Sequence, residues 1–126
     1  MPEAPAVLVV EDEFFVVASI EETLREAGFD PSIVSSGEEA VALLTTQAYR
    51  ALITDINLSG TMKGWEVAKI ARQSDPVFPV VYMTGSNERE WAVEGVPNSL
   101  LLTKPFAPAQ VVTAIARLLN KDTPTR

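Results

Sequence analysis

The sequence predicts an α/β domain built on a parallel sheet, and two patterns carry that prediction. Five short apolar runs of strand length recur along the 126 residues, and several of them are rich in β-branched side chains. Segments with apolar residues at helical spacing separate these runs. Alternation of strand and helix is typical of a parallel sheet covered on both faces by helices. A chain of this length is expected to form a single domain over 1–126.

The predicted elements follow one another with clear breaks. The strands are expected at residues 6–10, 31–35, 51–54, 80–83 and 100–102, and the helices at 13–27, 36–47, 65–74 and 108–120. Gly28 closes the first helix, and Pro76 and Pro79 separate the third helix from the strand after it. Within the first helix, the residues predicted to face the core are Val16, Ile20, Leu24 and Ala27.

Two segments are predicted to be less regular. Residues 86–98 begin polar and contain Gly95 and Pro97, so any helix there should be short or frayed. Residues 121–126 are polar and are expected to form a disordered tail, which leaves a core of about 5–120.

A five-stranded doubly wound sheet most often has the flavodoxin-like (βα)5 strand order 2-1-3-4-5. In that order the carboxyl ends of strands 1, 3, 4 and 5 share one edge of the sheet, where such folds bind their ligands. The residues that follow these strands are Glu11 and Asp12, Asp55, Thr84, and Lys104. The topology therefore predicts that these side chains converge.

Composition excludes several kinds of protein. The net charge of −7 argues against a nucleic-acid-binding surface. The chain has no cysteine and no histidine, which excludes disulfides, thiolate nucleophiles, most zinc sites and a phosphohistidine on this chain. Neither a signal peptide nor a membrane-spanning run is visible, so we expect a cytoplasmic protein without a membrane partner.

The predicted cluster suits phosphoryl chemistry. Three carboxylates at close range would raise one another's pKa unless a cation neutralises them, and oxygen ligands favour Mg²⁺ or Mn²⁺. In this hypothesis Asp55 is the nucleophile that becomes phosphorylated, and Lys104 and Thr84 contact the phosphoryl oxygens. The metal ligands would be Glu11, Asp12, Asp55 and the backbone carbonyl of Asn57.

Each of four predicted strands is followed closely by one of the segments Glu11-Asp12, Asp55, Thr84 and Lys104-Pro105-Phe106. In this pattern the chain resembles a response regulator receiver domain of two-component signalling, of the single-domain chemotaxis-regulator type. The resemblance implies a phosphorelay in which a sensor histidine kinase or histidine phosphotransfer protein phosphorylates Asp55 with Mg²⁺. It also implies that Thr84 then moves toward the phosphoryl group and that the surface formed by residues 86–98, the strand at 100–102 and the helix at 108–120 rearranges.

Two positions depart from the family pattern. Many receivers have Met-Pro shortly after the phosphorylated aspartate, where this chain has Leu58-Ser59-Gly60. Many also have Tyr or Phe three residues before the lysine, where this chain has Leu101. We therefore expect that the switch depends on ordering of residues 85–98 rather than on an inward-turning aromatic ring.

Successive residues of a helix are rotated by about 100°, and this step places Phe14 and Phe15 well off the buried stripe of the first helix. Both are therefore predicted to be exposed. Exposed aromatic residues beside the site favour a docking face for the phosphodonor, and packing under a loop is the alternative. Trp65 and Trp91 are expected to be packing residues.

Each site residue also has a simpler interpretation. Asp55 could only begin a turn, Glu11 and Asp12 could favour a helix N-terminus, Thr84 could cap a helix, and Lys104 could be a solvated charge.

For the whole chain we expect a stand-alone phosphoacceptor that signals through protein contacts with an unidentified partner, not an enzyme. The alternatives are a degenerate receiver used only for binding and an aspartate-nucleophile phosphatase. Asn57 weakens the phosphatase alternative because the Asp-x-Asp pair is incomplete.

Overall fold

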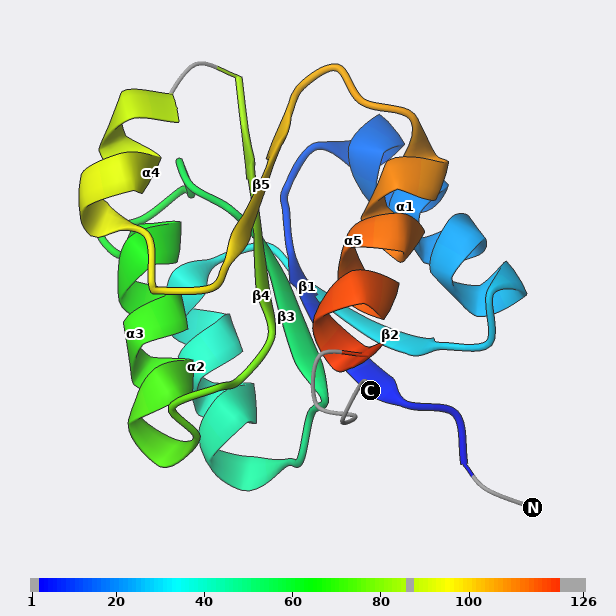
Figure 1. Cartoon of the computed structure of the whole chain (residues 1–126), viewed down its shortest axis with the longest axis horizontal. Helices are drawn as coiled ribbons and strands as arrows, with labels where there is room; N and C mark the ends of the chain where they lie inside the picture. The colour runs from blue at the N-terminus through cyan, green and yellow to red at the C-terminus, as the bar shows by residue number, and fades with distance from the viewer. Residues whose placement is uncertain (1–2, 86–87, 121–126) are drawn as a thin grey trace.

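The computed structural model describes residues 3–85 and 88–120 and contains one five-stranded parallel sheet (Figure 1). Its strands are β1 (Ala6–Val10), β2 (Asp30–Val34), β3 (Ala51–Asp55), β4 (Val80–Thr84) and β5 (Leu100–Thr103). Its helices are α1 (Phe14–Glu26), α2 (Gly37–Thr46), α3 (Gly64–Ser74), α4 (Glu88–Glu94) and α5 (Pro108–Asn120). The strand order β2-β1-β3-β4-β5 confirms the predicted topology. The prediction for residues 121–126 lies outside the described residues.

The sheet separates two apolar cores (Figure 1). Leu8, Leu52 and Tyr82 point toward the side that α2 and α3 cover, while Val9 and Ile53 point toward α1 and α5. Successive residues of a strand face opposite sides of a sheet, so a central strand with helices on both faces must be apolar at almost every position. This requirement explains the continuous apolar runs of β1, β3 and β4.

The end of α1 differs from the prediction. Ala27 is exposed, because α1 ends at Glu26 and Ala27 is already its C-cap. Gly28 follows with a φ of 95°, and the Phe29 N–H donates to the Leu24 carbonyl at 2.9 Å. This reversal is a Schellman-type ending, in which the residue after the glycine makes the hydrophobic contact. Phe29 therefore packs against the core in the place predicted for Ala27.

Helix α4 is short, as expected, and spans seven residues. Its described part begins at Glu88, four positions after Thr84. Both tryptophans are packing residues, as predicted. Trp65 is buried with its ring 4.8 Å from that of Tyr82, and the Trp91 indole N–H donates to Ser99 Oγ at 3.0 Å. Across the described ranges, none of the helices has the length and apolar character needed to span a bilayer.

Candidate functional site

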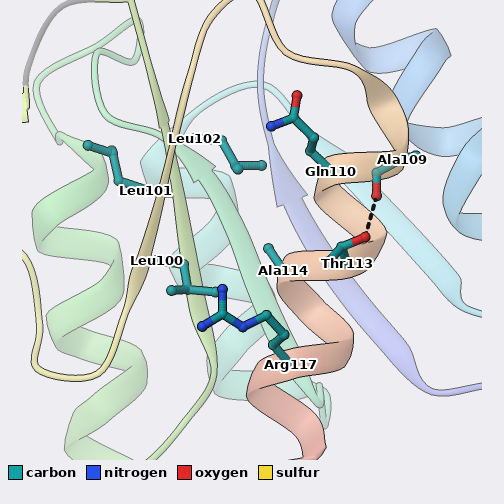
Figure 2. Close-up of a pocket in the computed structure, with 8 residues that line it drawn as sticks. All are labelled: Leu100, Leu101, Leu102, Ala109, Gln110, Thr113, Ala114 and Arg117. Carbon is teal, nitrogen blue, oxygen red and sulfur yellow. Dashed lines mark hydrogen bonds between the residues drawn. The ribbon is translucent and has the colours of Figure 1, made fainter.

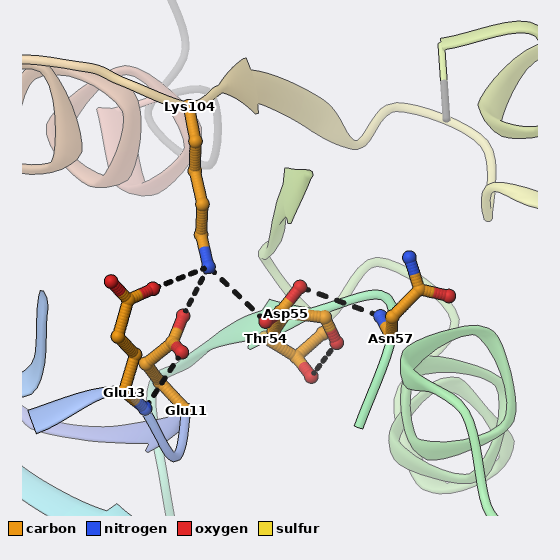
Figure 3. A network of polar contacts seen from close by, with 6 residues as sticks. All are labelled: Glu11, Glu13, Thr54, Asp55, Asn57 and Lys104. Atoms are coloured by element: carbon orange, nitrogen blue, oxygen red, sulfur yellow. Dashed lines mark hydrogen bonds and ion pairs between the residues drawn. The ribbon is translucent and has the colours of Figure 1, made fainter. Parts of the chain in front are cut away.

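The strand ends bring the predicted residues to one edge of the sheet, where Figure 3 shows Glu11, Asp55 and Lys104. Asp55 ends β3 and pairs in register with Met83 of β4, so Thr84 lies one position further at the same edge. Lys104 follows β5, and its backbone N–H donates to the Thr84 carbonyl at 2.7 Å. Glu11 follows β1, where its own N–H donates to the Val34 carbonyl at 3.0 Å. The parallel register thus gathers residues that lie far apart in the sequence.

Lys104 is the cation at the centre of this cluster. Its Nζ lies 2.9 Å from Glu11 Oε1 and 3.2 Å from Asp55 Oδ2, with Glu13 Oε1 further away at 3.8 Å (Figure 3). Lys104 is therefore not a solvated charge. Glu13 was not predicted as a site residue, although its position as the last of three consecutive acids after β1 was a possible signal.

Glu11 and Asp55 are buried acids, 1% and 8% exposed, respectively. Glu11 Oε2 accepts a hydrogen bond from the Glu13 N–H at 3.0 Å. Among the described residues, Glu11 Oε1 has the Lys104 ion pair but no well-directed hydrogen bond. Buried carboxylate oxygens are normally hydrogen-bonded or bound to a cation, so this oxygen is able to take a further ligand.

Burial is the main cause that raises the pKa of both Glu11 and Asp55. Lys104 opposes the rise in both, and the negative charge of Asp55 adds a smaller increase to the pKa of Glu11. The predicted repulsion between carboxylates is thus present for Glu11, but burial raises its pKa more. For Lys104 itself, burial disfavours the charge, but Glu11 and Asp55 outweigh burial and raise its pKa.

Glu11, Asp12 and Asp55 form a group that fits a hard cation. One carboxylate oxygen from each lies within 4.8 Å of the others, and Asp12 is exposed, so the group is open to solvent on one side. An all-oxygen donor set of this charge suits Mg²⁺ better than zinc. Asn57 lies in the loop that follows β3, and its N–H donates to Asp55 Oδ1 at 3.4 Å (Figure 3).

Phe14 and Phe15 open α1 and are 73% and 80% exposed, as predicted. This exposure argues against packing under a loop, and the two rings meet edge to face at a centroid distance of 5.4 Å. Phe15 also lines a groove of about 400 Å³ that reaches Lys104 and Phe106. The two rings therefore stand beside the acidic cluster as an exposed aromatic pair.

A second groove, of about 310 Å³, runs between β5 and α5 (Figure 2). Leu100 and Leu102 pack toward α5, whereas Leu101 points to the opposite side of the strand and packs against the core beneath α3 (Figure 2). Leu101, at the position where an aromatic residue was expected, is therefore a half-buried core residue on the side of α4.

Comparison with known proteins places the chain among signalling domains. A family model described as "Response regulator receiver domain" matches residues 7–116. A curated relative, the alkaline phosphatase synthesis transcriptional regulatory protein PhoP of Bacillus subtilis, is 31% identical over 118 residues. That match covers 92% of this chain and 49% of PhoP, so the chain spans about half the length of such relatives.

Two solved structures are also similar. The response regulator receiver protein from Sinorhizobium medicae is 43% identical with a TM-score of 0.90, and the match covers 94% of this chain and 96% of that one. The chemotaxis response regulator CheY4 of Vibrio cholerae is 26% identical with a TM-score of 0.80, and the match covers 91% and 98% of the two chains.

Proposed function

This chain belongs to the response regulator receiver family, and we propose that it accepts a phosphoryl group on Asp55 and signals through protein–protein contacts. The observation that carries the proposal is the position of Asp55 at the end of the central strand. Its carboxylate lies 3.2 Å from Lys104 Nζ, and one of its oxygens lies within 4.8 Å of a carboxylate oxygen of Glu11 and of Asp12. Positioning and charge neutralisation are the main requirements of phosphoryl transfer.

In the proposed reaction a carboxylate oxygen of Asp55 attacks the phosphorus of a phosphohistidine. A phosphorus–oxygen bond forms, the phosphorus–nitrogen bond breaks, and its electron pair stays on the departing imidazole. Glu11, Asp12 and Asp55 would hold Mg²⁺, or Mn²⁺ as a substitute, with the backbone carbonyl of Asn57 as a further ligand. The cation would neutralise charge on the phosphoryl oxygens.

Lys104 and Thr84 would bind the phosphoryl group once it is on Asp55. In the present state the Lys104 ammonium is shared between Glu11 and Asp55. The negatively charged oxygens of the phosphoryl group, once it is on Asp55, would draw the ammonium toward them, and the Thr84 hydroxyl would donate a hydrogen bond to another of these oxygens.

The proposed function is tested with acetyl phosphate and Mg²⁺ followed by intact mass measurement. A single phosphoryl adduct is expected on the wild type and none on Asp55→Ala, because that substitution removes the attacking oxygen. Rapid multiple turnover without a stable adduct would favour a phosphatase, and absence of the adduct on the wild type would favour a binding-only receiver.

The phosphodonor is proposed to be a sensor histidine kinase or a histidine phosphotransfer protein that docks on Phe14 and Phe15. Both rings are exposed, Phe15 lines the groove that leads to Lys104, and the Phe14 ring contacts that of Phe15 edge to face. Large exposed aromatic side chains next to a reactive group are typical of the few residues that carry binding energy.

Phe14→Ala is expected to slow transfer from a phosphohistidine donor about tenfold and to leave phosphorylation by acetyl phosphate unchanged. Val93→Ala is the matched control, since Val93 is also 80% exposed but lies on α4. An equal donor rate for Phe14→Ala and the wild type would argue against this docking face.

Onward signalling is proposed to involve ordering of residues 85–98, because Leu101 lacks an aromatic ring. Residues 86 and 87 of this segment lie outside the described residues. The downstream partner would be a protein that distinguishes the phosphorylated state from the unphosphorylated one. The phosphoryl group would act by shifting the populations of two conformations.

A further inference from the structure

The loop between β3 and α3, residues 56–63, is attached to the beginning of α2 and follows directly on Asp55. Ser59 forms an isolated parallel bridge with Ser36, the N-cap residue of α2, and its hydroxyl donates to the Ser35 carbonyl at 3.4 Å. Gly37 is buried so closely that a Cβ on it would lie 3.0 Å from Met62 Cβ. The loop thus depends on contacts with α2 as well as with its own strand.

Glu38 in the first turn of α2 makes the central polar contact with this loop. Its Oε2 accepts a hydrogen bond from the Thr61 hydroxyl at 3.0 Å. The backbone N–H of Glu38 itself, the Thr61 hydroxyl, and the N–H groups of Thr61 and Met62 together lower the pKa of Glu38. These contacts join residues 23 positions apart in the sequence.

Gly60 allows the loop to approach the Glu38 carboxylate. Its φ is 92°, and a Cβ on Gly60 would lie 3.1 Å from Glu38 Oε1. Only glycine adopts such a φ at little cost. Gly60 also leaves the loop with more conformational freedom to lose, and fixing each residue costs roughly 1–2 kcal/mol of entropy. A contact from α2 would therefore help to fix the conformation of this loop, which has no proline between Asp55 and α3.

We propose that Glu38 is a positioning residue for the phosphorylation site. By holding residues 60–62 against α2, it keeps the preceding residues 56–59, and with them the Asn57 carbonyl, in place beside Asp55. This inference rests on the proposed function, because it concerns the metal that the Asp55 site would bind. In this proposal the Glu38 carboxylate on α2 fixes the conformation of the loop, as a rigid turn within the loop would otherwise do.

Glu39 provides a matched control on the same turn of α2. Its Oε1 accepts hydrogen bonds from the Ser35 N–H at 3.2 Å, the Ser35 hydroxyl at 3.1 Å and the Ser36 hydroxyl at 3.2 Å. These partners belong to the segment before α2, which meets the β3–α3 loop at Ser59, whereas Glu38 accepts its hydrogen bond from Thr61 of the loop itself. Glu38 and Glu39 carry the same charge near the same helix N-terminus, so their variants share any effect on the helix dipole.

The experiment compares Glu38→Ala, Glu38→Gln and Glu39→Ala with the wild type. Calorimetric titration is expected to show Mg²⁺ bound about fivefold more weakly by Glu38→Ala, equivalent to the loss of about one net hydrogen bond. Glu38→Gln retains an oxygen acceptor and should recover most of the affinity. Glu39→Ala should bind Mg²⁺ as the wild type does.

Amide hydrogen exchange of the metal-free proteins gives an independent result. Residues 57–63 should exchange faster in Glu38→Ala than in the wild type, and at the wild-type rate in Glu39→Ala. Equal exchange of this loop in Glu38→Ala and the wild type would overturn the inference, as would equal Mg²⁺ affinity. Failure of the wild type to bind Mg²⁺ would instead overturn the proposed function, and exchange would still decide the role of Glu38.

Discussion

Lys104→Met is expected to lower the free energy of unfolding of the metal-free protein by about 3 kcal/mol at about pH 8. The lysine stem is largely retained by methionine, but the ammonium group 2.9 Å from Glu11 Oε1 is lost. Glu11 is 1% exposed, so its charge would remain buried without its ion-pair partner. Chemical denaturation of the metal-free wild type and variant measures the difference.

The effect should depend on pH, and the direction follows from the raised pKa values. Burial already places the pKa of Glu11 and Asp55 above the ordinary carboxyl range. The folded chain then holds protons that the unfolded chain has released. For each carboxyl group, stability therefore falls as pH rises from its pKa in the unfolded chain to its pKa in the folded chain. Removing Lys104 raises both folded-state values further. The destabilisation should therefore be largest at alkaline pH and shrink as pH falls toward the ordinary carboxyl range.

Lys69→Met is the control for Lys104→Met. Lys69 pairs with Glu94 at 3.0 Å, but both side chains are about half exposed. An exposed pair of this kind contributes about 0–1 kcal/mol. Adding Glu11→Gln to Lys104→Met should recover most of the lost stability by removing the buried charge. A pH-independent loss, or no recovery in the double variant, would contradict the assignment of Lys104 as the partner of buried carboxylates.

Gly64→Ala is expected to destabilise the protein by about 3 kcal/mol, at the upper end of the usual cost of overpacking. Gly64 is the first residue of α3, and its N–H donates to the Ile56 carbonyl at 2.9 Å. A Cβ at this position would overlap the backbone carbonyl oxygen of Asp55 and lie 3.1 Å from Ile56 Cα. Backbone atoms cannot rotate away as the end of a side chain can, so the strain would fall on Asp55 itself.

Helix propensity alone would predict that Gly64→Ala stabilises the protein, because alanine is the better helix former by about 1 kcal/mol. A loss of stability would therefore report the clash with the backbone of Asp55. Gly85→Ala is the control: a Cβ there meets no atom of the described residues within 4 Å, and the change should stay within about 0.5 kcal/mol. Urea denaturation measures both, and the acetyl phosphate assay should show slower labelling of Gly64→Ala only. A Gly64→Ala protein as stable as the wild type would show that α3 can move away from Asp55 at little cost.

Much of the architecture was predictable from local patterns. Strand position followed from apolar runs, helix position from spacing of three and four, and the site from polar residues directly after the strands. The exposure of Phe14 and Phe15 also followed from helical periodicity. The error at Ala27 came from extending that periodicity past the end of the helix, where Gly28 reverses the chain and Phe29 makes the core contact.

The sequence by itself predicted the strand order, as the most common one for a five-stranded doubly wound sheet, and most of the residues at one edge of it, because in a parallel sheet every strand ends at the same side. Only the tertiary structure decided which of these side chains contact one another. Lys104 pairs with Glu11 and Asp55 together, burial rather than repulsion is the main cause that raises their pKa values, and Glu38 reaches the loop beside Asp55. These contacts depend on side-chain geometry and burial across elements, which periodicity along the chain does not encode.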